Sequence, residues 1–176
     1  MIIVGFPGIG KSSFAATHEN FIDLDIDSVF GNNLHDHSWY GLYCNVASAL
    51  SSQGYNVFVS SDREIRWSLN RTSEDVIAIV PSLQLKDQWI ERLRSLSEDD
   101  SIRAKNKYSH IENHFERDVK EIMNECVCVV IDDIDDYSIE DLIRKGKVKV
   151  EIDNLLNGDL NESKLTEVKE FINKLY

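Results

Sequence analysis

Short apolar runs alternate along the chain with longer stretches of mixed polarity. Five of these runs predict β-strands, at 2–5, 21–24, 56–60, 76–80 and 127–131. Each run is almost continuously hydrophobic, which is typical of strands that are buried on both faces, as in the parallel sheets of α/β proteins. The pattern therefore predicts a five-stranded parallel sheet.

Between several of these runs, apolar residues recur at three- and four-residue spacing, which predicts amphipathic helices. Strand followed by helix, repeated, favours a three-layer α/β fold with right-handed crossovers. We interpret the aromatic members of the helical stripes as core residues. The stripes consist of Trp39, Leu42, Tyr43, Val46, Ala47 and Leu50; of Leu83, Trp89, Ile90 and Leu93; and of Tyr108, Ile111, Phe115, Val119 and Ile122.

The C-terminal part of the chain gives more mixed signals. Ser138 followed by Asp141 resembles a capping box that opens a helix, and Gly146 is typical of a helix end. KVKVEID at 147–153 alternates like an edge strand, and the apolar residues within 165–175 are spaced as in a final amphipathic helix. We expect one domain over 1–176, with an accessory strand and helix at about 147–176.

Composition and charge narrow the class of partner. The chain has 176 residues and a net charge of −12, so long nucleic acids are unlikely partners. Its three cysteines show no metal-binding spacing, which indicates reduced thiols. The apolar start lacks a basic leader, and no later apolar run is long enough to span a bilayer. We therefore expect a cytoplasmic protein without a membrane partner.

The segment Gly5-Phe6-Pro7-Gly8-Ile9-Gly10-Lys11-Ser12 matches the GxxxxGK[ST] pattern of the P-loop, between an apolar strand and a helix-compatible segment. Glycines let successive N–H groups turn inward around a phosphate, and the following helix start adds partial positive charge. Lys11 is expected to reach the β- and γ-phosphates of ATP, and Ser12 to bind Mg²⁺. The predicted cofactor-binding residues are Gly8, Ile9, Gly10, Lys11, Ser12 and Ser13.

An acidic segment, FIDLDID at 21–27, follows closely. Strand alternation puts Asp23, Asp25 and Asp27 on one side as the chain reaches the carboxyl end of the sheet, where α/β proteins bind ligands. Carboxylates there hold Mg²⁺, accept hydrogen bonds from a substrate, or take the proton of an attacking oxygen. We assign such roles to Asp23 and Asp25, and interpret Asp27 as a solvated turn residue.

Together, GFPGIGKSS and FIDLD resemble the phosphate-binding loop and second strand of small P-loop kinases, such as shikimate kinase and nucleoside monophosphate kinases. The similarity is closest to phage-encoded adenylate-kinase-like or deoxynucleotide-kinase-like proteins, and it spans about the first 95 residues. Its further motifs are the VSS of 59–61 with Glu64 and Arg66, and then Pro81, Leu85, Lys86, Glu91 and Arg92.

This resemblance implies a five-stranded P-loop kinase fold and transfer of the γ-phosphoryl group of ATP, with Mg²⁺, to a small acceptor. A (deoxy)nucleoside monophosphate is the expected acceptor, and the expected location is the host cytoplasm if the chain is phage-encoded. The catalytic residues would be Lys11, Asp25, Arg66 and Arg92; the acceptor would be bound by Asp23, Asp25, Arg63 and Arg66, and the metal by Ser12 and Asp23. Arg92 would belong to a lid at about 92–107, in which Arg94, Arg103, Lys105 and Lys107 are further candidates.

Other functions stay open. VCVVIDD at 127–133 resembles the metal-binding strand of P-loop ATPases. In an ATPase, Asp132 would bind Mg²⁺ and Asp133 would polarise water, and a nucleotide-binding regulatory module would likewise have this pair at its Mg²⁺ site. A shikimate-like alcohol kinase would use Asp25 as a general base, and a polynucleotide 5′-kinase is a further alternative. We interpret His110 and His114 as exposed residues of a helix. His35 and His37 are candidates for contact with a base or a sugar.

Overall fold

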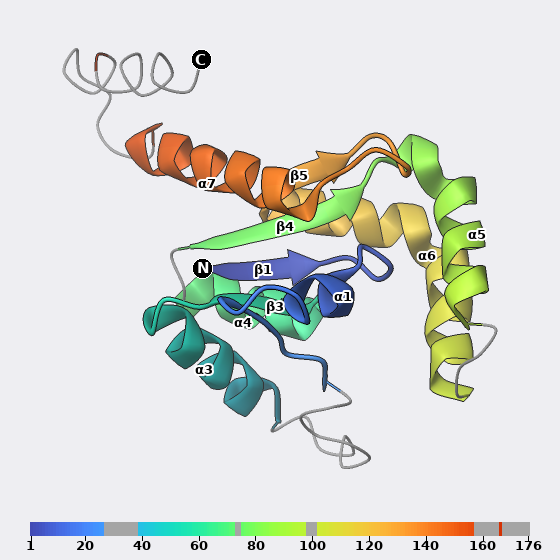
Figure 1. The fold of residues 1–176 in the computed structure, drawn as a ribbon, viewed down its shortest axis with the longest axis horizontal. Helices are drawn as coiled ribbons and strands as arrows, with labels where there is room; N and C mark the ends of the chain where they lie inside the picture. Colours follow the sequence, from blue (N-terminus) through green and yellow to red (C-terminus); the bar gives the residue numbers. More distant parts are fainter. Residues whose placement is uncertain (27–38, 73–74, 98–101, 157–165, 167–176) are drawn as a thin grey trace.

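A computed structural model describes residues 1–26, 39–72, 75–97, 102–156 and 166 (Figure 1). Its strands form one all-parallel sheet of five strands in the order β2-β3-β1-β4-β5. This confirms the predicted α/β fold, which is consistent with the P-loop NTPase type, and all five predicted strands. The strands are β1 (Ile2–Gly5), β2 (Phe21–Asp23), β3 (Asn56–Ser60), β4 (Val76–Pro81) and β5 (Val127–Ile131).

Helices cover both faces of this sheet (Figure 1). On one face, Phe14 of α1 contacts Phe58 of β3, and Gly146 of α7 lies against Ile77 of β4. On the other face, α6 packs on β4 and β5, and α4 contacts both α3 and α6. The helices are α1 (Lys11–Ala15), α3 (Trp39–Ser52), α4 (Arg63–Thr72), α5 (Lys86–Ser97), α6 (Ile102–Glu125) and α7 (Ile139–Leu156), with a 3-10 turn at Leu83–Leu85 before α5.

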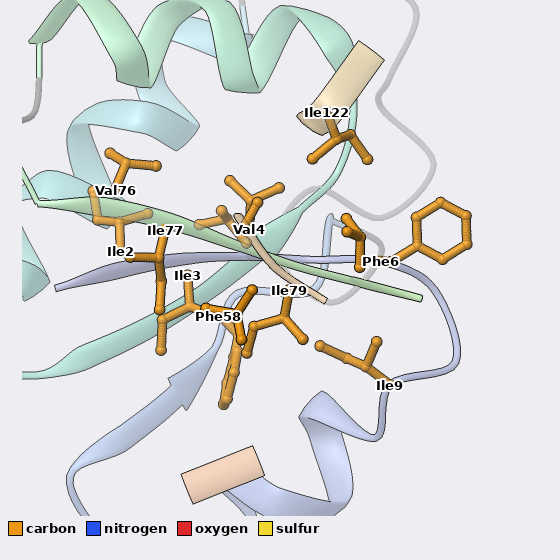
Figure 2. Close-up of a cluster of buried hydrophobic side chains, with 14 of the residues drawn as sticks. Ile2, Ile3, Val4, Phe6, Ile9, Phe58, Val76, Ile77, Ile79 and Ile122 are labelled. Atoms are coloured by element: carbon orange, nitrogen blue, oxygen red, sulfur yellow. The ribbon is translucent and has the colours of Figure 1, made fainter. Parts of the chain in front are cut away.

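The core forms on both faces of the central strands. In Figure 2, Ile3 and Ile79 are directed to the side of Ile9, whereas Val4 is directed to the side of Ile122. All of them are buried, which explains why the strands read as continuous apolar runs. The stripe predicted for 108–122 is confirmed, because its members from 111 onward are buried, but the 39–50 stripe contains one error, since the Leu42 side chain is 57% exposed.

The prediction for the C-terminal part needs correction. Ser138 does cap α7, because its hydroxyl accepts a hydrogen bond from the amide of Asp141 at 3.4 Å. Gly146 does not end this helix, however, and 147–153 is not a strand, since α7 continues to Leu156. The buried side chains of Leu142, Ile143 and Val150 follow helical spacing instead. The structure describes only residue 166 of the range 165–175, so the helix predicted there lies outside the described residues.

Gly146 lies in the middle of α7 because the helix approaches the sheet closely there. A Cβ atom at this position would lie 2.5 Å from Ile77 Cδ1 and 3.3 Å from Val129 Cγ2. Ile77 is fully buried, and close packing in protein interiors leaves few voids into which a side chain can move. The glycine is therefore required by packing between α7 and the sheet.

Replacing Gly146 by alanine should therefore lower the free energy of unfolding by about 1–2 kcal/mol, although alanine is the better helix former. Gly41 is the matched control, because it also lies within a helix but a Cβ there would meet nothing within 4 Å. Gly41→Ala should raise stability by about 0.5–1 kcal/mol. Urea denaturation measures both; equal effects of the two substitutions would contradict the close packing of α7.

Helix α4 has no counterpart among the predicted helices. Its sequence, REIRWSLNRT, is mostly polar, and only Ile65 and Leu69 supply its buried apolar side. Within the described ranges, no helix is both long and apolar enough to cross a membrane.

Candidate functional site

The segment between β1 and α1 lies at the carboxyl end of the central strand of the sheet. Gly8 and Gly10 have φ angles of 88° and 92°, a region that side-chain-bearing residues rarely occupy. Gly8 is also close to α5, since a Cβ there would lie 2.8 Å from Leu93 Cδ2. These glycines therefore allow a tight turn that leads directly into the first turn of α1.

Side chains from two distant elements hold the outer side of this loop. Trp89 Nε1 donates to the carbonyl of Pro7 at 2.9 Å, Arg92 Nε to that of Gly8 at 2.9 Å, and the Tyr137 hydroxyl to that of Ile9 at 3.0 Å. Burial raises the pKa of Tyr137, and nearby Arg92 lowers it only in part, so the hydroxyl remains a donor. Because the carbonyls are bound from outside, the loop can direct amides to its inner side, where an anion would lie.

Lys11 extends back toward the end of β1. Its Nζ donates to the carbonyl of Gly5 at 3.0 Å, and its aliphatic chain fills the space where a Cβ of residue 5 would stand. The first-turn amides of α1 have no carbonyl partner within the helix, which makes this end electropositive. The lysine ammonium group and the start of α1 thus lie on one side of the loop.

Ser12 and Asp23, the two predicted metal ligands, lie together. The Ser12 hydroxyl donates to Asp23 Oδ2 at 2.6 Å, and this contact joins α1 to the end of β2. The second carboxylate oxygen, Oδ1, is buried and has no hydrogen-bond partner among the described residues. A buried carboxylate oxygen without a partner is costly unless a cation or water satisfies it. The two side chains therefore fit a Mg²⁺ ion, which prefers oxygen ligands.

Asp25 follows Asp23 just beyond the last residue pair of β2. Leu24, between these two carboxylates, accepts a hydrogen bond through its carbonyl from the buried Tyr43 hydroxyl at 2.6 Å. Burial raises the pKa of Tyr43, and the charges of Asp23 and Asp25 raise it further. The Tyr43 hydroxyl thus holds the backbone residue between the two carboxylates at the carboxyl edge of the sheet.

Arg66, predicted to bind an acceptor phosphate, is only 3% exposed. Its Nε donates to Glu125 Oε2 at 2.8 Å, its Nη1 donates to the Ser61 carbonyl, and its Nη2 lies 3.8 Å from Glu121 Oε2. Two carboxylates of α6 thus balance the charge of this guanidinium, although its buried Nη2 has no hydrogen-bond partner among the described residues. Binding of an acceptor phosphate by Arg66 remains a prediction, and the ion pairs with Glu121 and Glu125 argue against it. Arg63, at the exposed start of α4, likewise remains a predicted acceptor residue.

Arg92, predicted as a lid arginine, lies beside the loop. Its guanidinium carbon is 5.7 Å from the centre of the Trp89 ring and 5.8 Å from that of Tyr137. Together with Gly10, Ser13 and Ile134, it lines an open hollow of about 470 Å³. The structure therefore places a cation and an aromatic ring at the outer edge of the candidate donor site.

The predicted lid range, 92–107, covers the end of α5 and the start of α6. These helices pack against each other, and Arg94 bonds to the Tyr108 hydroxyl at 3.0 Å and lies 3.8 Å from Glu112. The side chains of Arg103, Lys105 and Lys107 are outside the described part of the structure. Closure of this hairpin over a nucleotide stays a prediction.

Asp132 and Asp133, the alternative residues of the metal site, have no contact with Ser12 among those that the described residues make. Asp132 and Asp133 are exposed after β5, an edge strand, and Asp133 Oδ1 accepts a hydrogen bond from the amide of Asp135 at 2.9 Å. That contact is typical of a turn. Asp23, by contrast, bonds directly to Ser12.

The histidines have a smaller part. His110 and His114 are exposed as predicted, and their rings stack at 4.6 Å on α6. His35 and His37 lie outside the described residues. Within the described ranges, no group of three or more His, Cys, Asp or Glu side chains is arranged to hold a metal ion.

Sequence patterns did not reveal the roles of Trp89 and Tyr137 at the loop. Trp89 is fully buried, as its place in an apolar stripe predicts, yet its indole nitrogen bonds to Pro7. Tyr137 stands immediately before the Ser138 cap, and its position beside Ile9 depends on how the chain returns after β5. The only signal in the sequence was the presence of polar aromatic residues, which usually need a partner when buried.

The geometry thus joins a P-loop, a lysine and a Ser–Asp pair at the carboxyl edge of a parallel sheet. This fold is compatible with a nucleotide-binding α/β domain. No family model matches the chain, and no curated protein matches it.

Proposed function

We propose that this protein is a P-loop phosphotransferase that binds ATP with Mg²⁺ and transfers the γ-phosphoryl group to a small acceptor. The observation that carries the proposal is the contact between Ser12 and Asp23 beside the loop, with Asp23 Oδ1 buried and without a partner among the described residues. A loop that only turned the chain would gain nothing from such a carboxylate, whose isolation is costly.

In this proposal the loop amides and Lys11 hold the phosphates of the donor. Lys11 leaves the Gly5 carbonyl to contact the β- and γ-phosphates, where it balances charge that builds up during transfer. Ser12 and Asp23 hold Mg²⁺, which supplies electrostatic stabilisation of the phosphate oxygens. Catalysis then depends mainly on positioning and on charge balance.

The nucleoside part of the donor would occupy the hollow next to the loop. Arg92 and Tyr137 border it with a guanidinium and an aromatic ring, both suited to stacking on a base. Ile134 adds an apolar wall. The volume of about 470 Å³ is within the range of ordinary ligand sites.

For the acceptor, two classes follow from the resemblance, and one observation distinguishes them. A nucleoside monophosphate needs cations around its phosphate, but Arg66 is already paired with Glu121 and Glu125. A hydroxyl acceptor needs a general base, and the carboxylate of Asp25 follows Asp23 at the carboxyl edge of the sheet. The pairing of Arg66 therefore favours an alcohol, such as the hydroxyl of a nucleoside or another small polyol, over the monophosphate.

The proposal is tested by measuring ADP formation by the purified protein with a panel of acceptors. The panel contains ribo- and deoxynucleoside monophosphates, nucleosides, small alcohols and an oligonucleotide with a 5′-hydroxyl end. We expect stoichiometric ADP formation that requires one of these acceptors. ATP consumption at the same rate with every acceptor and with none would instead identify an ATPase.

Replacing Asp23 by asparagine should raise the Mg²⁺ concentration needed for half-maximal activity by roughly 10–100-fold, because the neutral amide is a weaker partner for the metal. Asp132→Asn is the matched comparison, since it makes the same chemical change in an exposed carboxylate after β5. It should leave the Mg²⁺ dependence unchanged. A larger effect of Asp132→Asn would instead support the ATPase assignment of the metal site.

A further inference from the structure

The hydrogen-bond ladder between β2 and β3 is interrupted at the site by a side chain. The amide of Asn56 donates to the Asn20 carbonyl at 2.9 Å, and the amide of Leu24 donates to the Phe58 carbonyl at 3.0 Å. Parallel ladders repeat every second residue, so the next bond would run from the amide of Ser60 to the carbonyl of Leu24. The Tyr43 hydroxyl occupies that place: it accepts from the Ser60 amide at 3.0 Å and donates to Leu24 at 2.6 Å.

The inserted hydroxyl changes the geometry of the ligand edge. Two hydrogen bonds through an intervening oxygen span more than the single bond they replace, so β2 separates from β3 after Asp23. The separation begins at Leu24, the residue between Asp23 and Asp25. The hydroxyl thus fixes the backbone between the two carboxylates: Asp23 is still paired with Phe58, and Asp25 follows where the two strands part.

Tyr43 is well suited to hold that position. Its side chain is completely buried, with 0% of its surface exposed. It comes from α3, which packs on β3 and β1. Trp39 meets it edge to face at 6.0 Å on the same helix. The polar tip is satisfied by its two backbone partners, which makes the arrangement stable in a buried place.

We propose that Tyr43 is a positioning residue of the phosphotransfer site: its hydroxyl replaces a rung of the sheet and thereby sets Asp23 and Asp25 toward the metal and the acceptor. The inference rests on the proposed function for the roles of these two carboxylates. The interrupted ladder itself depends only on the contacts among Leu24, Tyr43 and Ser60.

Tyr43→Phe tests the proposal, because it removes the oxygen and keeps the ring. The measurement is the dissociation constant of ATP, with and without Mg²⁺, by isothermal calorimetry. We expect similar affinities without Mg²⁺, and a loss of about 10-fold or more in the tightening that Mg²⁺ produces, as is usual when a supporting residue of a metal ligand is removed. A Mg²⁺ effect within twofold of that of the unaltered protein would overturn the proposal.

Ala47→Gly controls for lost stability, since Ala47 is buried one turn further along α3 and its substitution weakens the helix without touching the hydroxyl. It should lower the melting temperature and leave the Mg²⁺ effect intact. If Tyr43→Phe does not fold, the unaltered protein is examined by NMR, where the Tyr43 hydroxyl proton should exchange slowly and show contact with the Ser60 amide. Absence of that contact would overturn the interrupted ladder.

The two proposals fail in different ways. If the unaltered protein does not bind ATP, the proposed function is wrong, and the positioning role of Tyr43 is wrong with it. If ATP binds and Mg²⁺ tightens it equally in the unaltered protein and in Tyr43→Phe, only the role of Tyr43 is wrong.

Discussion

Replacing Lys11 by alanine should lower the rate of ATP-dependent phosphoryl transfer by at least about 10²–10³-fold, the usual cost of removing one charge-stabilising donor from a transition state. Lys11 contacts the Gly5 carbonyl, so its ammonium group already lies at the loop. The measurement is the initial rate of ADP formation with the acceptor found in the panel assay.

Lys120→Ala is a suitable control, because the substitution removes the same charge from an exposed position on α6. There, Lys120 Nζ lies 3.9 Å from Glu116 Oε2. Its rate should stay within about twofold of the unaltered protein, as expected for a surface residue. Thermal melting of both variants separates a catalytic loss from unfolding. Full activity in Lys11→Ala would exclude the P-loop as the donor site.

Asp25→Asn should have the second large effect. If the acceptor is an alcohol, the loss of the general base should reduce kcat by about 10²–10⁴-fold, with little change in the affinity for ATP. If the acceptor is a phosphate, which is already ionised, no base is needed and the rate should fall much less. The substitution therefore separates the two classes of acceptor.

The control for this experiment is Asp87→Asn, which makes the same change at an exposed position in the first turn of α5. Only a small effect on stability is expected there. Rates are compared at saturating acceptor and ATP, so that weaker binding does not imitate slower chemistry. Equal losses in both variants would contradict a role for Asp25 in proton transfer.

The strands could be predicted from the sequence because burial on both faces leaves a clear local signal, the continuous apolar run. Ser12 and Asp23 could be predicted as neighbours for a related reason: a P-loop and the end of the following strand both lie at the carboxyl edge of the sheet. In each case a local pattern and a general rule of topology were sufficient.

Features that depend on contacts between distant segments could not be predicted in this way. Arg66 pairs with Glu121 and Glu125. Both are far away along the chain, Glu125 by 59 residues. Gly146 resembled a helix end because local rules cannot show that α7 meets Ile77. The alternating Lys and Val residues of 147–150 fit a strand locally, although the buried Val150 belongs to a helical face.

The three side chains that bind the outer carbonyls of the loop have a thermodynamic consequence. Because Trp89, Arg92 and Tyr137 fix the backbone of the loop when the chain folds, its conformational entropy is lost at that stage and not on ligand binding. Association with a nucleotide then orders few additional groups. Residues of α5 and of the segment before α7 thereby contribute to affinity without touching a phosphate.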